Sequence, residues 1–166
     1  MYTKGRKAAA LLLSAALTAA AGTALAANGA SFAGHYTTAF PAKQEQTAGN
    51  LLNSDRARYN LAPLTIDAEL SRIARIKSQD MRDQRYFAHI SPTYGDVNSM
   101  LRRFGYTFTA AGENIAHHAT VERAQAAFLS SPGHRQNILS RAYTRVGLGA
   151  AIDEQGAVYL TQIFVR

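Results

Sequence analysis

The C-terminal part of the chain carries two β-rich runs in immediate succession, and this feature constrains the fold most. The runs are RVGLGAAID, which starts at Arg145, and AVYLTQIFV, which starts at Ala157, and only Glu154, Gln155 and Gly156 separate them. A short connection that contains glycine predicts a β-hairpin between the two runs. Because helical patterns precede the hairpin, we expect an α+β protein with helices packed on both faces of an antiparallel sheet.

The segments ahead of the hairpin contain the helical patterns. They cover residues 47–60, 68–85, 96–104 and 121–130. Asp67 and Thr120 are expected to cap the second and the fourth of these helices, and Gly105 is expected to end the third. The apolar stripe of the second helix predicts its buried side. Its polar side is expected to face solvent and carries Arg72, Arg75, Gln79, Arg82 and Asp83.

The N-terminus has the pattern of an export signal. A basic segment, MYTKGRK, precedes an apolar segment, and the tripeptide Ala-Leu-Ala ending at Ala26 fits a signal-peptidase site, so residues 1–26 are predicted to be a cleaved signal peptide. The apolar segment is short for a permanent membrane span, and an uncleaved anchor is the alternative. Residues 27–46 are expected to form a flexible leader before a domain at 47–166. The protein is therefore expected in the periplasm or outside the cell.

Composition and motifs limit the chemistry and the partners. Without Lys4, Arg6 and Lys7 of the signal, 15 of the 18 basic residues remain against 11 acidic ones, a net charge of +4. This charge allows weak attraction to anionic cell-wall polymers or lipids, whereas the lack of a Lys/Arg run argues against nucleic acid. No cysteine is present, which excludes thiol catalysis, disulfides and Cys-ligated zinc. Neither a nucleophile elbow nor an H-E-x-x-H or phosphate-binding glycine motif occurs.

Polar residues at breaks between the expected elements could carry chemistry. His89 lies in HISP, Glu113 in GENIA and His134 in SPGHR. Two imidazoles and a carboxylate suit a divalent cation such as zinc, and the same groups could transfer protons near neutral pH. Each histidine could equally be a hydrogen-bonded structural residue beside a turn. His117 and His118 are expected to lie exposed in a loop, outside this site.

Taken in order, these motifs resemble those of the CAP superfamily (cysteine-rich secretory proteins, antigen 5 and pathogenesis-related 1 proteins), also called the SCP domain, in its bacterial secreted branch. The resemblance runs from about Gly49 to Phe164 through LLNSDRARYNLAPLTIDAELSRIARIKSQDM, FAHISP, AGENIA, FLSSPGHRQNIL, RVGLGAAI and VYLTQIF. It implies a three-layer α-β-α sandwich with a central cleft. In the family, two histidines and two glutamates line that cleft, and divalent cations occupy the histidines in some members.

The resemblance assigns the first cleft histidine to His89, the glutamate of Gly-Glu-Asn to Glu113 and the second histidine to His134. Ser131, or Ser130 if the register shifts by one, stands where the family has its other glutamate. A serine supplies no charge and accepts no proton near pH 7. A mechanism that needs two carboxylates is therefore excluded, and a cation is expected to bind less tightly than with both.

Two functions of different classes follow, because members of the family share no single reaction. The first is a binding module at the cell surface or outside the cell, whose cleft holds a ligand or a cation on His89 and His134. The second is a weak metal-dependent hydrolase that activates water on the metal, with Glu113 as the catalytic base. A third interpretation gives the cluster a structural role only. The missing second carboxylate favours the binding module, whereas the ligand and the oligomeric state do not follow from the sequence.

Overall fold

The computed structural model describes residues 41–166, and within α1 it describes side chains from Lys43 onward. The predicted signal peptide and the predicted leader up to residue 40 lie outside these residues. The elements in chain order are α1 (Pro41–Arg58), β1 (Thr65–Ile66), α2 (Ala68–Asp83), α3 (Val97–Arg103), β2 (Ala111–His118), α4 (Val121–Ser130), α5 (Pro132–Leu139), β3 (Arg145–Ile152) and β4 (Val158–Val165). None of the helices in this range is long and apolar enough to cross a membrane.

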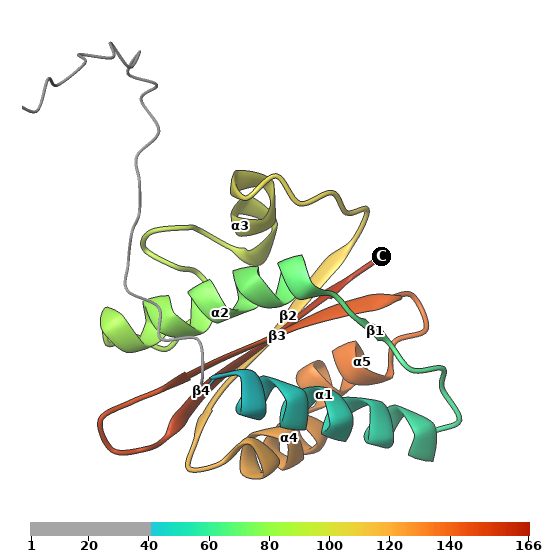
Figure 1. Cartoon of the computed structure of the whole chain (residues 1–166). Helices are drawn as coiled ribbons and strands as arrows, with labels where there is room; N and C mark the ends of the chain where they lie inside the picture. Colours follow the sequence, from blue (N-terminus) through green and yellow to red (C-terminus); the bar gives the residue numbers. More distant parts are fainter. Residues whose placement is uncertain (1–40) are drawn as a thin grey trace, which may run out of the picture. The chain divides into compact units, whose positions relative to one another are not determined.

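The elements form three layers, as predicted, with a sheet between two layers of helices (Figure 1). The strand order is β1-β3-β4-β2, so β2 is an edge strand. All pairs are antiparallel except the short pairing of β1 with β3. Alternate side chains of β4 reach opposite cores: Leu160 and Phe164 pack with α1, α4 and α5, whereas Ile163 and Val165 pack with α2 and α3.

The predicted hairpin is present. β3 and β4 pair along their whole length, from Arg145 opposite Val165 to Ile152 opposite Val158. The amide of Asp153 donates to the carbonyl of Ala157 at 2.9 Å and closes the turn. Gly156 adopts a φ of 83° in this turn, a backbone conformation that glycine adopts without steric cost. The connection that glycine signals in the sequence therefore forms for the expected reason.

Helix α2 lies unusually close to β3 because two glycines replace side chains at the contact. A Cβ atom at Gly149 would come within 2.0 Å of the Ala74 carbonyl carbon, and one at Gly147 within 2.3 Å of the Leu70 carbonyl carbon. The hydroxyl of Ser78 then reaches the sheet and donates to the carbonyl of Gly149 at 2.9 Å. This close packing fixes the height at which the buried side chains of α2 lie above the sheet.

The helix caps follow the sequence signals. Asp67 accepts a hydrogen bond from the Leu70 amide at 2.9 Å at the start of α2, and Thr120 accepts one from the Arg123 amide at 3.3 Å at the start of α4. Gly105 follows α3 with a φ of 70°. Both predicted caps and the glycine stop are confirmed.

An ion pair between Glu45 and Arg75 corrects two expectations. Arg75 donates to both carboxylate oxygens of Glu45, at 2.7 and 2.5 Å, and the Ala150 amide donates to the same carboxylate. Residues 41–46, expected to be flexible leader, therefore belong to α1, which begins at Pro41, a residue favoured in the first turn of a helix. The polar side of α2 is not wholly solvated either, because Arg75 is paired and Gln79 is buried.

Candidate functional site

The carboxylate of Glu113 and the imidazole of His89 form the centre of the candidate site. Glu113 lies on the edge strand β2 with its side chain 3% exposed, and its Oε1 is 2.8 Å from Nδ1 of His89. His89 lies between α2 and α3, and its side chain is 56% exposed. When the neutral ring donates its Nδ1–H to the carboxylate, Nε2 keeps its lone pair and faces away from Glu113. The pair therefore presents one oriented imidazole nitrogen.

A fully buried lysine of α2 holds the segment that carries His89. Lys77 Nζ donates to the carbonyl of Ala88 at 2.8 Å and to that of His89 at 2.9 Å. Burial lowers the pKa of Lys77, and the negative charges of Glu113 and Asp80 partly oppose this effect. Lys77 thus fixes the backbone of His89 and lies within electrostatic range of the Glu113 carboxylate.

The carboxylate of Asp80 anchors the same segment on its other side. It accepts a hydrogen bond from Ser91 Oγ at 2.7 Å and another from the Tyr86 hydroxyl. Burial and the bond to Asp80 raise the pKa of Tyr86 above its usual value. Ser91 Oγ in turn accepts from the amides of Thr93 and Tyr94. The loop is therefore tied to α2 at several points, which limits the motion of His89.

His134 approaches from the opposite helical layer. Helix α4 ends at Ser130 and α5 begins at Pro132, so Pro132 and Gly133 form the first turn of α5 and the break between the helices lies at Ser131. The His134 ring centroid is 6.3 Å from that of His89 and 5.2 Å from that of Phe128. Burial, with a smaller contribution from His89, lowers the pKa of His134. This shift favours the neutral ring, the form that can bind a metal ion.

Two asparagines beneath His134 fix its backbone. Asn114 Nδ2 donates to the carbonyl of His134 at 3.1 Å, and Asn137 Nδ2 donates to Asn114 Oδ1 at 2.9 Å and to the carbonyl of Glu113 at 3.3 Å. Glu113 and Asn114 are neighbours on a strand, so their side chains point to opposite faces of the sheet. Two consecutive residues of the edge strand therefore position the two histidines: Glu113 contacts the ring of His89, and Asn114 binds the backbone of His134.

The asparagines belong to a buried polar network that extends to α1. Asn114 Nδ2 also donates to Gln162 Oε1 at 3.1 Å, Gln162 Nε2 donates to Gln125 Oε1 at 2.8 Å, and Gln125 Nε2 donates to Asp55 Oδ2 at 2.8 Å. No motif in the sequence predicts this network. Its only local signal is the presence of amide side chains at positions of β2, β4 and α4 that otherwise follow apolar patterns.

The structure brings His89, Glu113 and His134 close together. Neither Ser131 nor Ser130 makes a side-chain hydrogen bond to this cluster among residues 41–166. Ser131 is half-buried at the helix junction without a side-chain cap bond, and Ser130 Oγ donates back to the carbonyl of Ala126 at 2.9 Å. Oε2 of Glu113 is buried and has no hydrogen-bond partner among residues 41–166. The cluster thus consists of two imidazoles and one buried carboxylate.

The geometry limits how a cation could bind. Within residues 41–166, no group of three or more His, Asp or Glu side chains could hold a metal ion. Two imidazoles on one tetrahedral zinc, with bonds of about 2.0–2.1 Å, place their ring centroids about 5 Å apart, compared with 6.3 Å between His89 and His134. A shared cation would therefore require the two rings to move about 1 Å closer. After such a shift the two imidazoles could supply two protein ligands, and water or a bound molecule would complete the coordination.

Comparison with known sequences decides the family. Residues 50–164 match the family described as "CAP: Cysteine-rich secretory protein family". The chain belongs to the CAP superfamily. The match runs from the middle of α1 into β4 and contains His89, Glu113 and His134, so the resemblance of the motifs and the α-β-α fold lead to the same family.

Relatives of this CAP domain include bacterial proteins. It is 44% identical over 122 residues to the uncharacterized protein YkwD of Bacillus subtilis, covering 73% of this chain and 46% of YkwD. An extracellular protein containing a SCP domain from Bacillus anthracis has a TM-score of 0.71 at 36% identity, with 76% of this chain and 41% of that chain covered. An outer surface protein of Borrelia burgdorferi (TM-score 0.69, 17% identity, 75% and 92% covered) shares the fold. The CAP domain thus spans less than half of the two Bacillus proteins.

Proposed function

We propose that this CAP domain is an exported binding module in which His89 and His134 bind a divalent cation such as zinc, and through it a ligand, while Glu113 orients the His89 ring. The observation that carries the proposal is the 2.8 Å contact between Glu113 Oε1 and His89 Nδ1. A carboxylate behind one imidazole nitrogen orients the ring and strengthens its other nitrogen as a metal ligand. The neutral, lowered-pKa ring of His134 supplies the second nitrogen.

A binding role fits the cluster better than a hydrolytic one. In a metal-dependent hydrolase, Glu113 would act as the base on a metal-bound water. Here its Oε1 already contacts His89, and the side chain is buried behind that ring. Two protein ligands also leave several coordination positions open, which suits exchange of a bound molecule at the cation. The hydrolase is therefore the weaker candidate, and Glu113 is assigned a positioning role.

We further propose that the module works at the cell surface or outside the cell. The N-terminal pattern of a basic segment, an apolar segment and Ala-Leu-Ala supports export. The Bacillus anthracis relative is described as an extracellular protein. The net positive charge after signal removal favours weak contact with anionic cell-wall polymers or lipid headgroups over contact with neutral surfaces.

The experiment is a calorimetric zinc titration of the wild-type protein and of the His89→Ala/His134→Ala double variant. The wild type is expected to bind zinc, and the double variant should lose at least about tenfold in affinity. His118→Ala is the matched control, because His118 is an exposed histidine on β2 outside the cluster, and this variant should bind as the wild type does. Equal affinities of the wild type and the double variant would reject the proposal.

A further inference from the structure

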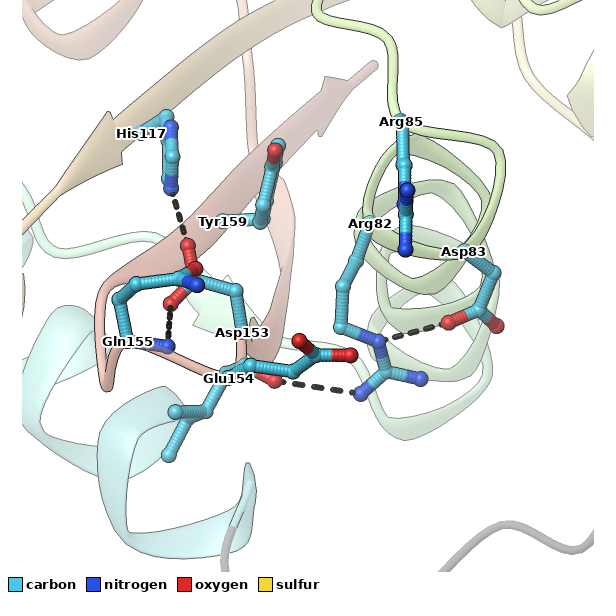
Figure 2. A pocket seen from close by; sticks show the side chains of 9 residues that line it. Arg82, Asp83, Arg85, His117, Asp153, Glu154, Gln155 and Tyr159 are labelled. Atoms are coloured by element: carbon cyan, nitrogen blue, oxygen red, sulfur yellow. Dashed lines mark hydrogen bonds and ion pairs between the residues drawn. The ribbon is translucent and has the colours of Figure 1, made fainter.

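A cavity lies against the face of the sheet that carries Glu113, at the other end of β2. It has a volume of about 790 Å³ and opens between the C-terminal end of α2, the ends of β2 and β4, and the β3–β4 turn (Figure 2). This size lies in the range of small-ligand sites. His117, which lines the cavity, is four positions along β2 from Glu113, so the two sites are about 13 Å apart along the strand. The expectation that His117 lies in a loop was wrong.

One wall of the cavity is a pair of aromatic rings on a fixed frame. His117 and Tyr159 are directly opposed on β2 and β4, and their rings stack with centroids 4.0 Å apart. His117 Nε2 is 2.7 Å from Asp153 Oδ2, and Asp153 also accepts from the amides of Gln155 and Ala157. One face of Tyr159 is covered by His117, and the other faces the arginines at the end of α2 (Figure 2).

The charged side chains around the cavity pair with each other except for two. Arg82 Nε is 2.7 Å from Asp83 Oδ1, and His117 is bound to Asp153. The guanidinium of Arg85 and the carboxylate of Glu154 have no ion pair or side-chain hydrogen bond with any residue in the range 41–166. The cavity thus offers one free positive group on its helix side and one free negative group on its turn side.

The backbone of Arg85 shows an unusual choice of residue. Arg85 follows α2 with a φ of 53°, the left-handed conformation that commonly ends a helix and that favours glycine. An arginine at this position tolerates backbone strain that glycine would avoid. Its side chain lines the cavity beside Arg82 and Asp83 (Figure 2). An arginine therefore stands at a position where the backbone conformation alone would favour glycine.

We propose that this cavity binds a short peptide with a free amino and a free carboxyl terminus. The peptide carboxylate pairs with Arg85, its ammonium group pairs with Glu154, and a side chain packs on the open face of Tyr159. A polyanion is disfavoured by the carboxylates of the lining and a polycation by the arginines, whereas a zwitterion presents one charge of each sign to the exposed Arg85 and Glu154. This site is independent of the proposed cation site.

The test uses the tripeptide Ala-Phe-Ala and two blocked forms of it, one N-acetylated and one with a C-terminal amide. By calorimetry, the wild-type protein is expected to bind the free tripeptide roughly tenfold more tightly than either blocked form. Arg85→Gly should remove the preference for the free carboxylate only, and Glu154→Gln should remove the preference for the free amine only. Arg85→Gly also relieves the backbone strain, so its thermal stability should equal or exceed that of the wild type.

Three results of the peptide titrations would overturn the peptide site. They are no binding of Ala-Phe-Ala at millimolar concentration, equal affinity for free and blocked forms, and binding that both variants leave unchanged. Tighter binding of a neutral chitin trisaccharide than of the peptide would also reject it and indicate a sugar site. Zinc titrations of Arg85→Gly and Glu154→Gln should match the wild type, so a failure of the peptide site is distinguishable from a failure of the cation site.

Discussion

The buried carboxylate of Glu113 lies 2.8 Å from the exposed imidazole of His89, although the residues are 24 positions apart in the chain. An edge strand and an irregular loop thus supply the two halves of one hydrogen bond. The acid is shielded from water and acts through the ring in front of it. The proposed function therefore gives Glu113 a positioning role, and its effect should be measurable through the metal affinity of His89.

Glu113→Gln should weaken zinc binding by about tenfold to a hundredfold. The amide oxygen can still accept from His89 Nδ1–H, but the negative charge that strengthens Nε2 as a ligand is lost. Zinc titration calorimetry measures the effect. Glu122→Gln, at an exposed glutamate in the first turn of α4, should leave zinc affinity unchanged. Equal affinities for Glu113→Gln and the wild type would refute the positioning role.

Lys77→Met should lower the free energy of unfolding by about 1–3 kcal/mol. Lys77 is buried, and its loss leaves the carbonyls of Ala88 and His89 without their donor. Urea denaturation measures the change. Lys43→Met, at an exposed lysine of α1, is the control and should alter stability by less than about 0.5 kcal/mol. If both variants lose the same stability, the carbonyl contacts of Lys77 contribute nothing measurable.

Gly149→Ala should destabilise the fold by about 3 kcal/mol or more, because the added methyl group would overlap the backbone of Ala74 in α2. Gly133→Ala is the matched substitution, since a Cβ atom there meets nothing within 4 Å and alanine favours the helix α5. Thermal unfolding of both variants should show a large loss for the first and no loss for the second. A small effect of Gly149→Ala would mean that α2 can move away from β3.

Stability should fall below about pH 4 partly through Asp67. Burial acts to raise the pKa of Asp67, but hydrogen bonds from the Leu70 amide and the Tyr106 hydroxyl, together with Arg145, outweigh burial and lower it. With a lower pKa in the folded state, the unfolded state binds more protons between the two pKa values. The contribution of Asp67 is therefore present above the unfolded pKa and is lost as the pH falls through the folded one.

Asp67→Asn tests this pH dependence, because asparagine keeps the side-chain oxygen that caps α2 but carries no titrating charge. Urea unfolding across the acidic range should give a shallower decline for the variant than for the wild type. Parallel declines of the two proteins would show that Asp67 does not contribute to acid unfolding.

Local signals in the sequence predicted the local structure. The caps Asp67 and Thr120 and the turn at Gly156 each depend on neighbours within a few residues, and each forms as expected. The pair of Glu45 and Arg75 depends on packing between helices 30 residues apart. The residues around Glu45 give no local signal for this ion pair. The predicted helix therefore began at residue 47, whereas α1 begins at Pro41.

The residues of the candidate site stood out at breaks between the expected elements, but only the resemblance to the family implied that they lie in one cleft. They come from separate elements, and no local spacing shows that His89 and His134 face each other across a strand edge. The support from Lys77 and Asn114 was not predictable, because a buried lysine or asparagine looks in the sequence like any exposed one. His117 and His118 were expected to be exposed in a loop; both are exposed, but pairing with β4 makes them part of a strand.

The most direct test of the cation site is an anomalous difference map from crystals of the protein soaked in zinc. The cluster predicts a peak within about 2.0–2.1 Å of His89 Nε2 and of one ring nitrogen of His134, with Glu113 still bound to His89 Nδ1. A peak at another place, or none at this cluster at a soak concentration well above the measured Kd, would contradict the account.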